Sequence, residues 1–231
     1  MDKLPPKDVN QEVFWDSKII KWEQERYDKN FSDASLLEKI ASNASRSLRY
    51  RSELTEQIIG KNCAGKTVSE IGCGTGRLAI KIINAGAKSY HGYDISSVAI
   101  NSAKQATKDF GVEDKINFSS ASVRSLPKLE TDINFSVGLL DWLNDEEIKI
   151  LLKKTNRSDC LHSFSELRSN FSQILHRLYV QIAYGHRTGK YVPRYFNAEF
   201  LCILVKSLTG KAPHVVRDKK LSFGAFISTL P

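Results

Sequence analysis

The residue types best suited to chemistry gather in a short glycine-rich run. The run Glu70-Ile-Gly-Cys-Gly-Thr-Gly76 lies between an apolar segment and a helical one. Gly72 and Gly74 permit a tight turn and let a ligand approach the backbone closely. Asp94 ends the next apolar segment, where an acid can accept both hydroxyls of a ribose. Together these residues predict a site for a ribose-containing ligand.

The charge of this run distinguishes two kinds of ligand. A dinucleotide-binding loop needs its third small residue at position 77, but that residue is Arg77 and the third glycine is Gly76. The Glu70 carboxylate would repel a pyrophosphate, whereas it suits the cationic ammonium and sulfonium groups of S-adenosylmethionine. We therefore expect S-adenosylmethionine rather than NAD. If these residues have no role in ligand binding, the alternatives are that Glu70 is an exposed strand end and that Asp94 caps a helix.

The stretch EIGCGTGRLAIKIINAGAKSYHGYDISSVAINSAKQ, residues 70–105, resembles the nucleotide-binding half of class I S-adenosylmethionine-dependent methyltransferases. The resemblance covers residues 66–143 well and the terminal strands more loosely. It implies methyl transfer from this cofactor and says little of the acceptor. It also implies a set of cofactor-binding residues: Glu70, Gly72, Cys73 and Gly74 at the methionine moiety, Asp94 at the ribose, Ile95 on the adenine, Ser122 and Val123 at the adenine amino group, Gly138 and Leu139 beside the sulfonium, and Arg51 at the cofactor's carboxylate. Ser122 departs from the family, which usually has an acid at that position.

Residues 166–197 form an insertion that is longer than an ordinary connection between a strand and a helix. We interpret it as a helical cap, because it follows the carboxyl end of a predicted strand, where ligands bind in open α/β sheets. Within it, Arg187 and Arg194 offer planar forks suited to phosphate or carboxylate, and Tyr179 offers a face for a sugar ring. These residues predict an anionic acceptor. The alternative is a basic, aromatic helix that packs on the sheet.

Three segments, WEQERY (22–27), SFSE (163–166) and LHRLYVQIAYGHRTGKYVPRYF (175–196), look like enzymes that methylate sugars or surface-polysaccharide precursors. This second resemblance implies a carbohydrate-like acceptor and a role in polysaccharide biosynthesis.

An oxygen nucleophile usually needs a general base, for which the sequence offers three candidates. His176 lies in the cap, away from the apolar face that helical periodicity defines, and histidine titrates near neutral pH. Asp141 follows the fourth predicted strand and would act as a base or orient one, and Glu166 ends the fifth. The alternatives are a surface histidine at 176 and an ordinary loop residue at 141. The histidines lack metal-ligand spacing, so we expect no catalytic metal.

Alternating elements must position these residues. Two helices are expected within residues 1–60, at Gln11–Lys29 and Ser35–Ile59. Strands are expected at Lys66–Ile71, Lys88–Asp94, Lys115–Ser120, Thr131–Val137 and Ser158–Ser165, and helices at Thr75–Ala85, Ser97–Phe110, Asn144–Lys154 and Ala198–Leu208. Strands that alternate with helices indicate parallel βαβ units. The last two β-rich runs, Pro213–Asp218 and Leu221–Thr229, are separated by two residues, which requires an antiparallel hairpin. We predict one α/β domain over 1–231, a doubly wound seven-stranded sheet, mostly parallel, that ends in this hairpin.

Composition limits the remaining possibilities. The chain has 231 residues and a net charge of +8, and residues 151–231 hold 13 Lys and Arg against 4 Asp and Glu. This asymmetry favours an anionic partner, either a small or glycan acceptor on the leading hypothesis or RNA on a second. The four scattered cysteines, the polar N-terminus and the absence of a 20-residue apolar run indicate a cytoplasmic protein without a membrane span. A protein methyltransferase and a non-catalytic cofactor-binding module remain alternatives.

Overall fold

The computed structural model describes residues 11–27, 36–108, 110–168, 173–174 and 194–231. Two helices, α1 (Gln11–Tyr27) and α2 (Leu36–Asn62), precede the sheet. The strands are β1 (Thr67–Ile71), β2 (Ser89–Asp94), β3 (Ile116–Ser120), β4 (Ile133–Ser136), β5 (Asp159–Ser165), β6 (His214–Val216) and β7 (Gly224–Ser228). The other helices are α3 (Ala79–Asn84), α4 (Ser97–Lys108), α5 (Asp145–Lys154) and α7 (Ala198–Thr209), with short 3₁₀ helices η1 (Leu140–Trp142) and η2 (Lys219–Leu221).

The strands form one seven-stranded sheet in the order β3-β2-β1-β4-β5-β7-β6. The pairs from β3 to β5 are parallel, whereas β7 is antiparallel to both β5 and β6. This arrangement confirms the predicted sheet and its C-terminal hairpin, and it is the class I methyltransferase fold.

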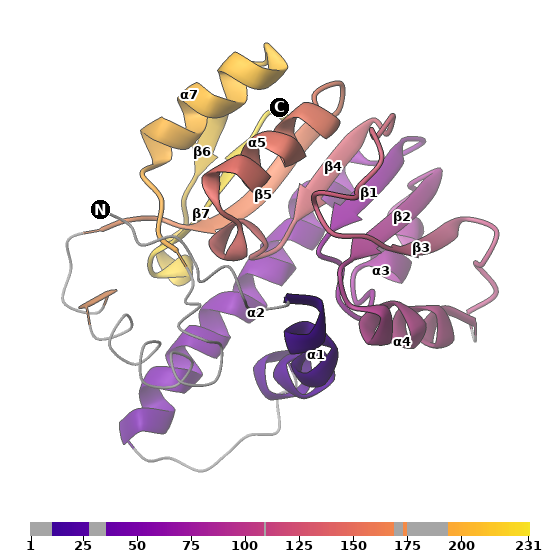
Figure 1. Cartoon of the computed structure of the whole chain (residues 1–231), viewed down its shortest axis with the longest axis horizontal. Helices are drawn as coiled ribbons and strands as arrows, with labels where there is room; N and C mark the ends of the chain where they lie inside the picture. The colour runs from indigo at the N-terminus through magenta and orange to yellow at the C-terminus, as the bar shows by residue number, and fades with distance from the viewer. Residues whose placement is uncertain (1–10, 28–35, 109, 169–172, 175–193) are drawn as a thin grey trace.

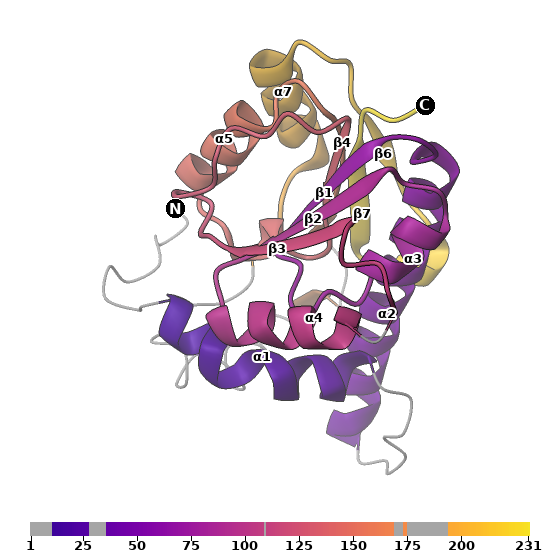
Figure 2. The same cartoon turned by 90° about the vertical axis from the view of Figure 1, so that its right-hand side faces the viewer.

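Helices cover both faces of the sheet, as Figures 1 and 2 show. On one face Ile59 of α2 and Ile82 of α3 pack into a buried apolar cluster with side chains of β1, β2 and β4. On the other face Leu151 of α5 and Leu201 of α7 pack into a second cluster. Burial of these apolar surfaces drives the helices onto the sheet. Because both faces are covered, the central strands are almost entirely buried, as their apolar runs predicted.

Several predicted boundaries are wrong by up to four residues, and two of these differences have a clear physical reason. Helix α3 begins at Ala79 rather than at Thr75, because Gly76 has φ +74° and the chain turns there before it can become helical. The hairpin connection is not two residues, since β6 ends at Val216 and β7 begins at Gly224. Helix η2 occupies this connection, and the Asp218 side chain caps it by accepting a hydrogen bond from Lys220 N at 2.8 Å. Helix α5 begins with a capping box, in which the Asn144 side chain accepts from Glu147 N and the Glu147 carboxylate accepts from Asn144 N.

The parallel strands bring five loops to one edge of the sheet. Strands β1 to β5 run in the same direction, so their carboxyl ends lie along that edge, at Ile71, Asp94, Ser120, Ser136 and Ser165. The loops that follow carry most of the described residues for which the sequence predicts chemistry.

Among the described residues, no helix is both long and apolar enough to cross a membrane.

Candidate active site

The glycine loop folds back against strand β2. The backbone N–H groups of Gly72 and Cys73 donate to Tyr93 O at 2.7 and 3.0 Å. Gly72, Gly74 and Gly76 all have positive φ, which residues with a Cβ rarely adopt. A methyl group at Gly76 would also lie 2.7 Å from the Phe118 ring. The loop therefore requires its glycines, both for conformation and for space.

Asp94 joins this loop to the start of helix α4. Its carboxylate accepts from Gly74 N at 2.8 Å and from Ser96 N at 2.9 Å, and the side chain is buried. Burial raises the pKa of Asp94, although the backbone donors oppose that rise. The carboxylate therefore binds backbone donors of both the glycine loop and the segment before α4, and its predicted contact with the ribose stays a prediction.

Glu70 is fully buried below the loop, which contradicts its alternative reading as an exposed strand end. The Tyr90 hydroxyl donates a hydrogen bond to its carboxylate. Burial raises the pKa of Glu70 to about 8, and repulsion from Glu23 and Asp94 adds to the rise. A cation bound nearby would favour the ionised form of this group.

Glu23 is not among the predicted site residues, although it lies in the WEQERY segment, and its carboxylate contacts the glycine loop. Glu23 is in helix α1 and accepts from Thr75 N at 3.2 Å and from Thr75 Oγ1 at 2.5 Å. No local pattern could have revealed this contact, because 52 residues separate the partners. With Glu70 and Asp94, it places three buried carboxylates around the loop. These three carboxylates can accept hydrogen bonds from hydroxyls and attract a positive charge, as in S-adenosylmethionine, and they would repel a pyrophosphate.

The loop after β4 packs against the glycine loop. A methyl group at Gly72 would lie 3.2 Å from Leu139 Cδ1, so Leu139 covers that glycine. Gly138 has φ +77°, and its N–H donates to Ser163 Oγ at 2.6 Å. The structure therefore brings Leu139 onto the glycine loop, and the predicted place of Gly138 and Leu139 beside the cofactor stays a prediction.

Asp141 forms the centre of a buried network at the ends of β4 and β5. Its carboxylate accepts from Ser165 N at 2.6 Å, from Ser165 Oγ at 2.7 Å and from Arg51 Nη1 at 3.2 Å. Arg51 Nη2 also donates to Ser165 Oγ at 3.1 Å. Burial raises the pKa of Asp141, while Arg51 and Ser165 oppose the rise. The network explains why Asp141 and Arg51 lie together, 90 residues apart in sequence.

The remaining described candidates lie around this edge. Ile95 is half-buried after β2, and Val123 is buried. Ser122 forms a local turn in which its Oγ accepts from Ser125 N at 3.1 Å. Glu166 is bound by Arg168 and Arg217, and hydrogen bonds from these arginines lower its pKa. An ionised carboxylate held by two arginines is a weak base, which leaves Glu166 poorly suited to take a proton.

Arg194 lies at the start of the last described segment. Its guanidinium donates to Leu143 O at 2.8 Å and to Asp145 Oδ1 at 2.7 Å, beside the loop that carries Asp141. Its backbone N–H also donates to Asp141 O at 2.7 Å.

His176, Tyr179 and Arg187 lie outside the described residues. Among those described, no group of His, Cys, Asp and Glu gathers to hold a metal ion.

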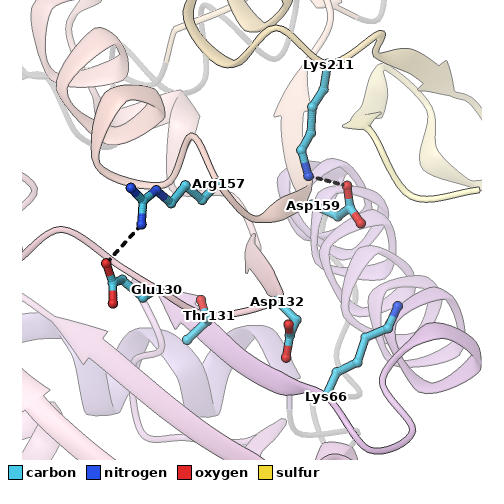
Figure 3. Close-up of a pocket in the computed structure, with 7 residues that line it drawn as sticks. All are labelled: Lys66, Glu130, Thr131, Asp132, Arg157, Asp159 and Lys211. Atoms are coloured by element: carbon cyan, nitrogen blue, oxygen red, sulfur yellow. Dashed lines mark hydrogen bonds and ion pairs between the residues drawn. The ribbon is translucent and has the colours of Figure 1, made fainter.

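A charged depression lies at the opposite edge of the sheet (Figure 3). It is lined by Lys66, Glu130, Thr131, Asp132, Arg157, Asp159 and Lys211, near the amino ends of β1, β4 and β5. Arg157 pairs with Glu130 and Lys211 pairs with Asp159, so these charges largely neutralise one another. The glycine loop is at the other edge, and we place the active site there.

Comparison with known proteins agrees with this geometry. Residues 68–158 match the family described as a methyltransferase domain. A ribosomal protein L11 methyltransferase of Alteromonas mediterranea is 36% identical over 74 residues, which are 32% of this chain and 25% of that protein. The chain thus matches about a quarter of the length of this curated relative.

Two solved structures share the fold over most of this chain. The magnesium protoporphyrin IX methyltransferase of Synechocystis PCC 6803 with bound SAH has a TM-score of 0.68 at 14% identity, over 94% of this chain and 96% of that one. Human N-acetylserotonin methyltransferase in complex with SAM has a TM-score of 0.56 at 15% identity, over 94% of this chain and 65% of that one. Residues 68–158 therefore match a methyltransferase domain, and the chain has the fold of these two S-adenosylmethionine-dependent methyltransferases.

Proposed function

We propose that this protein transfers the methyl group of S-adenosylmethionine to an oxygen of a small or carbohydrate-like anionic acceptor. The observation that carries the cofactor half is the buried carboxylate set Glu23, Glu70 and Asp94 around the glycine loop. Bound cofactor supplies an electrophilic methyl group. The chain's own residues then hold the two reactants in line and receive the proton.

The buried network of Arg51, Asp141 and Ser165 suggests a different role for each of the three candidate bases. Asp141 already accepts three hydrogen bonds from Arg51 and Ser165, so its role is to hold Arg51 and the loop after β4 in place. Arg51 remains our proposed partner for the cofactor's carboxylate. His176 is our proposed general base, because Glu166 is held ionised by two arginines.

The acceptor proposal rests on charge and on the names of the structural neighbours. Residues 151–231 carry most of the positive charge, and Arg194 places a guanidinium beside the Asp141 loop. The two neighbours described above are named for small-molecule acceptors. A phosphorylated or nucleotide-linked sugar combines the expected anionic charge with a ring, which agrees with polysaccharide biosynthesis in the cytoplasm.

An RNA or protein acceptor is the second candidate, favoured by the same basic C-terminal third and by a relative named for a ribosomal protein. A labelled-methyl screen over nucleotide sugars, phosphosugars, neutral sugars, RNA and basic proteins separates the two. We expect incorporation into a charged small acceptor with little dependence on salt. Incorporation into RNA that falls steeply with salt would favour the second candidate. Cofactor binding without transfer to any of these acceptors would indicate a binding module.

A further inference from the structure

Helix α1 attaches to three of the loops that surround the proposed cofactor site. Asp16 accepts from Ser96 Oγ at 2.6 Å in the loop after β2, and Glu23 binds Thr75 in the loop after β1. Trp15 packs edge-on against Trp142 in η1, with ring centroids 5.0 Å apart. Figure 2 shows α1 lying along α4, below the sheet. The helix therefore covers the carboxyl edge of the sheet although it is remote in sequence.

The Glu23 carboxylate differs from the other two contacts because it occupies the space above a loop glycine. A methyl group at Gly74 would collide with Glu23 Oε1. The side chain is buried, with 6% of its surface exposed. Burial raises the pKa of Glu23, the Thr75 donors and Arg77 lower it, and Asp94 raises it. An acid in this position is costly to ionise unless a cation approaches it.

We propose that Glu23 is a cofactor-binding residue, supplied by helix α1, whose carboxylate recognises a cationic group of S-adenosylmethionine on the glycine loop. The inference deepens the proposed function and rests on it. Thr75 holds the carboxylate over Gly74, so that the loop and the helix share one ligand. The cationic group is either the sulfonium or the ammonium, which have the same chemistry toward a carboxylate.

The alternative is that Glu23 only docks α1 on the loop. Asp16 provides a matched comparison, because it also docks α1 through a carboxylate but contacts the start of α4 rather than the glycine loop. A docking role predicts that losing either carboxylate weakens cofactor binding alike. A binding role predicts that only the loss of Glu23 does so.

The test is calorimetric titration of S-adenosylmethionine and S-adenosylhomocysteine into the parent, Glu23→Gln and Asp16→Asn proteins. We expect Glu23→Gln to weaken S-adenosylmethionine binding about tenfold or more, as loss of a charged hydrogen bond does. We expect Asp16→Asn to stay within about twofold of the parent, because this half-buried carboxylate contacts the start of α4 and not the glycine loop. If Glu23 recognises the sulfonium, S-adenosylhomocysteine affinity is unchanged. If it recognises the ammonium, both affinities fall together.

Three results would overturn the inference. One is a folded Glu23→Gln protein with parental affinity for both ligands, and another is an equal loss in Asp16→Asn. If Glu23→Gln does not fold, Glu23→Asp, which keeps the charge but withdraws it by one methylene, takes its place, and parental affinity in that variant is the third. A parent protein that binds neither ligand would remove the proposed function as well, so the two failures are distinguishable.

Discussion

The buried pair of Arg51 and Asp141 predicts a large loss of stability when its charge balance is broken. In Asp141→Asn the amide oxygen still accepts from Ser165 N, but the amide NH₂ replaces the oxygen that Arg51 and Ser165 Oγ bind. Arg51 is 2% exposed and its Nε has no hydrogen-bond partner among the described residues, so little water reaches the guanidinium to compensate for a lost partner. Gly224 closes its other side, because a methyl group there would lie 2.6 Å from Nε.

Breaking a buried ion pair on one side costs about 3–5 kcal/mol, and the retained bond places Asp141→Asn near the lower end, at about 3 kcal/mol. Urea unfolding followed by far-ultraviolet circular dichroism measures this change. The control is Glu130→Gln, which removes one partner of an exposed pair with Arg157, and its stability should stay at the parental level. A loss below about 1 kcal/mol in Asp141→Asn would refute the structural role. Lost turnover with unchanged stability would instead make Asp141 the base.

Three further predictions concern the site. Asp94→Ala should weaken S-adenosylmethionine binding at least about tenfold, because it removes the proposed hydrogen bond to the ribose, and unchanged affinity by calorimetry would contradict the cofactor assignment. His176→Ala should lower kcat about 10²-fold with cofactor affinity intact, and a kcat close to the parent's would exclude His176 as base. Because burial raises the pKa of Glu70 from 4.5 to about 8, the folded protein keeps a proton that the unfolded chain loses, so stability should fall between these pH values. Glu70→Gln should flatten that fall in thermal melts, and an identical pH profile would contradict the buried acid.

Local patterns in the sequence were sufficient to predict a mostly parallel seven-stranded sheet with a C-terminal hairpin, and to place Asp94 beside the glycine loop. Gly72 and Gly74 mark a turn that only particular backbone angles allow, and Asp94 ends a strand beside it, so chain-local rules place them together. The hairpin followed from two β-rich runs too close to be parallel. Its connection was misjudged because the Asp218 cap and η2 lie in a segment that looks like strand by composition.

The contacts that could not be predicted are those between distant segments. Glu23 reaches Thr75 across 52 residues, and Arg51 reaches Asp141 across 90. Nothing in the segments around Glu23 and Asp141 indicates their partners, because only tertiary packing brings these acids to Thr75 and Arg51. The resemblance to methyltransferases singles out Arg51 by its distance from the glycine loop in similar enzymes. That distance carries no information about the Asp141 carboxylate, which Arg51 contacts in the structure.

The edge-on contact between Trp15 and Trp142 gives the protein an optical reporter of its own. The chain has three tryptophans, and two of them join α1 to the loop beside Asp141. Indole emission depends on the polarity and packing around each ring, so any separation of α1 from the sheet would change the intrinsic fluorescence. Stopped-flow mixing with S-adenosylmethionine would therefore test, without an attached dye, whether ligand binding changes the contact between α1 and this loop.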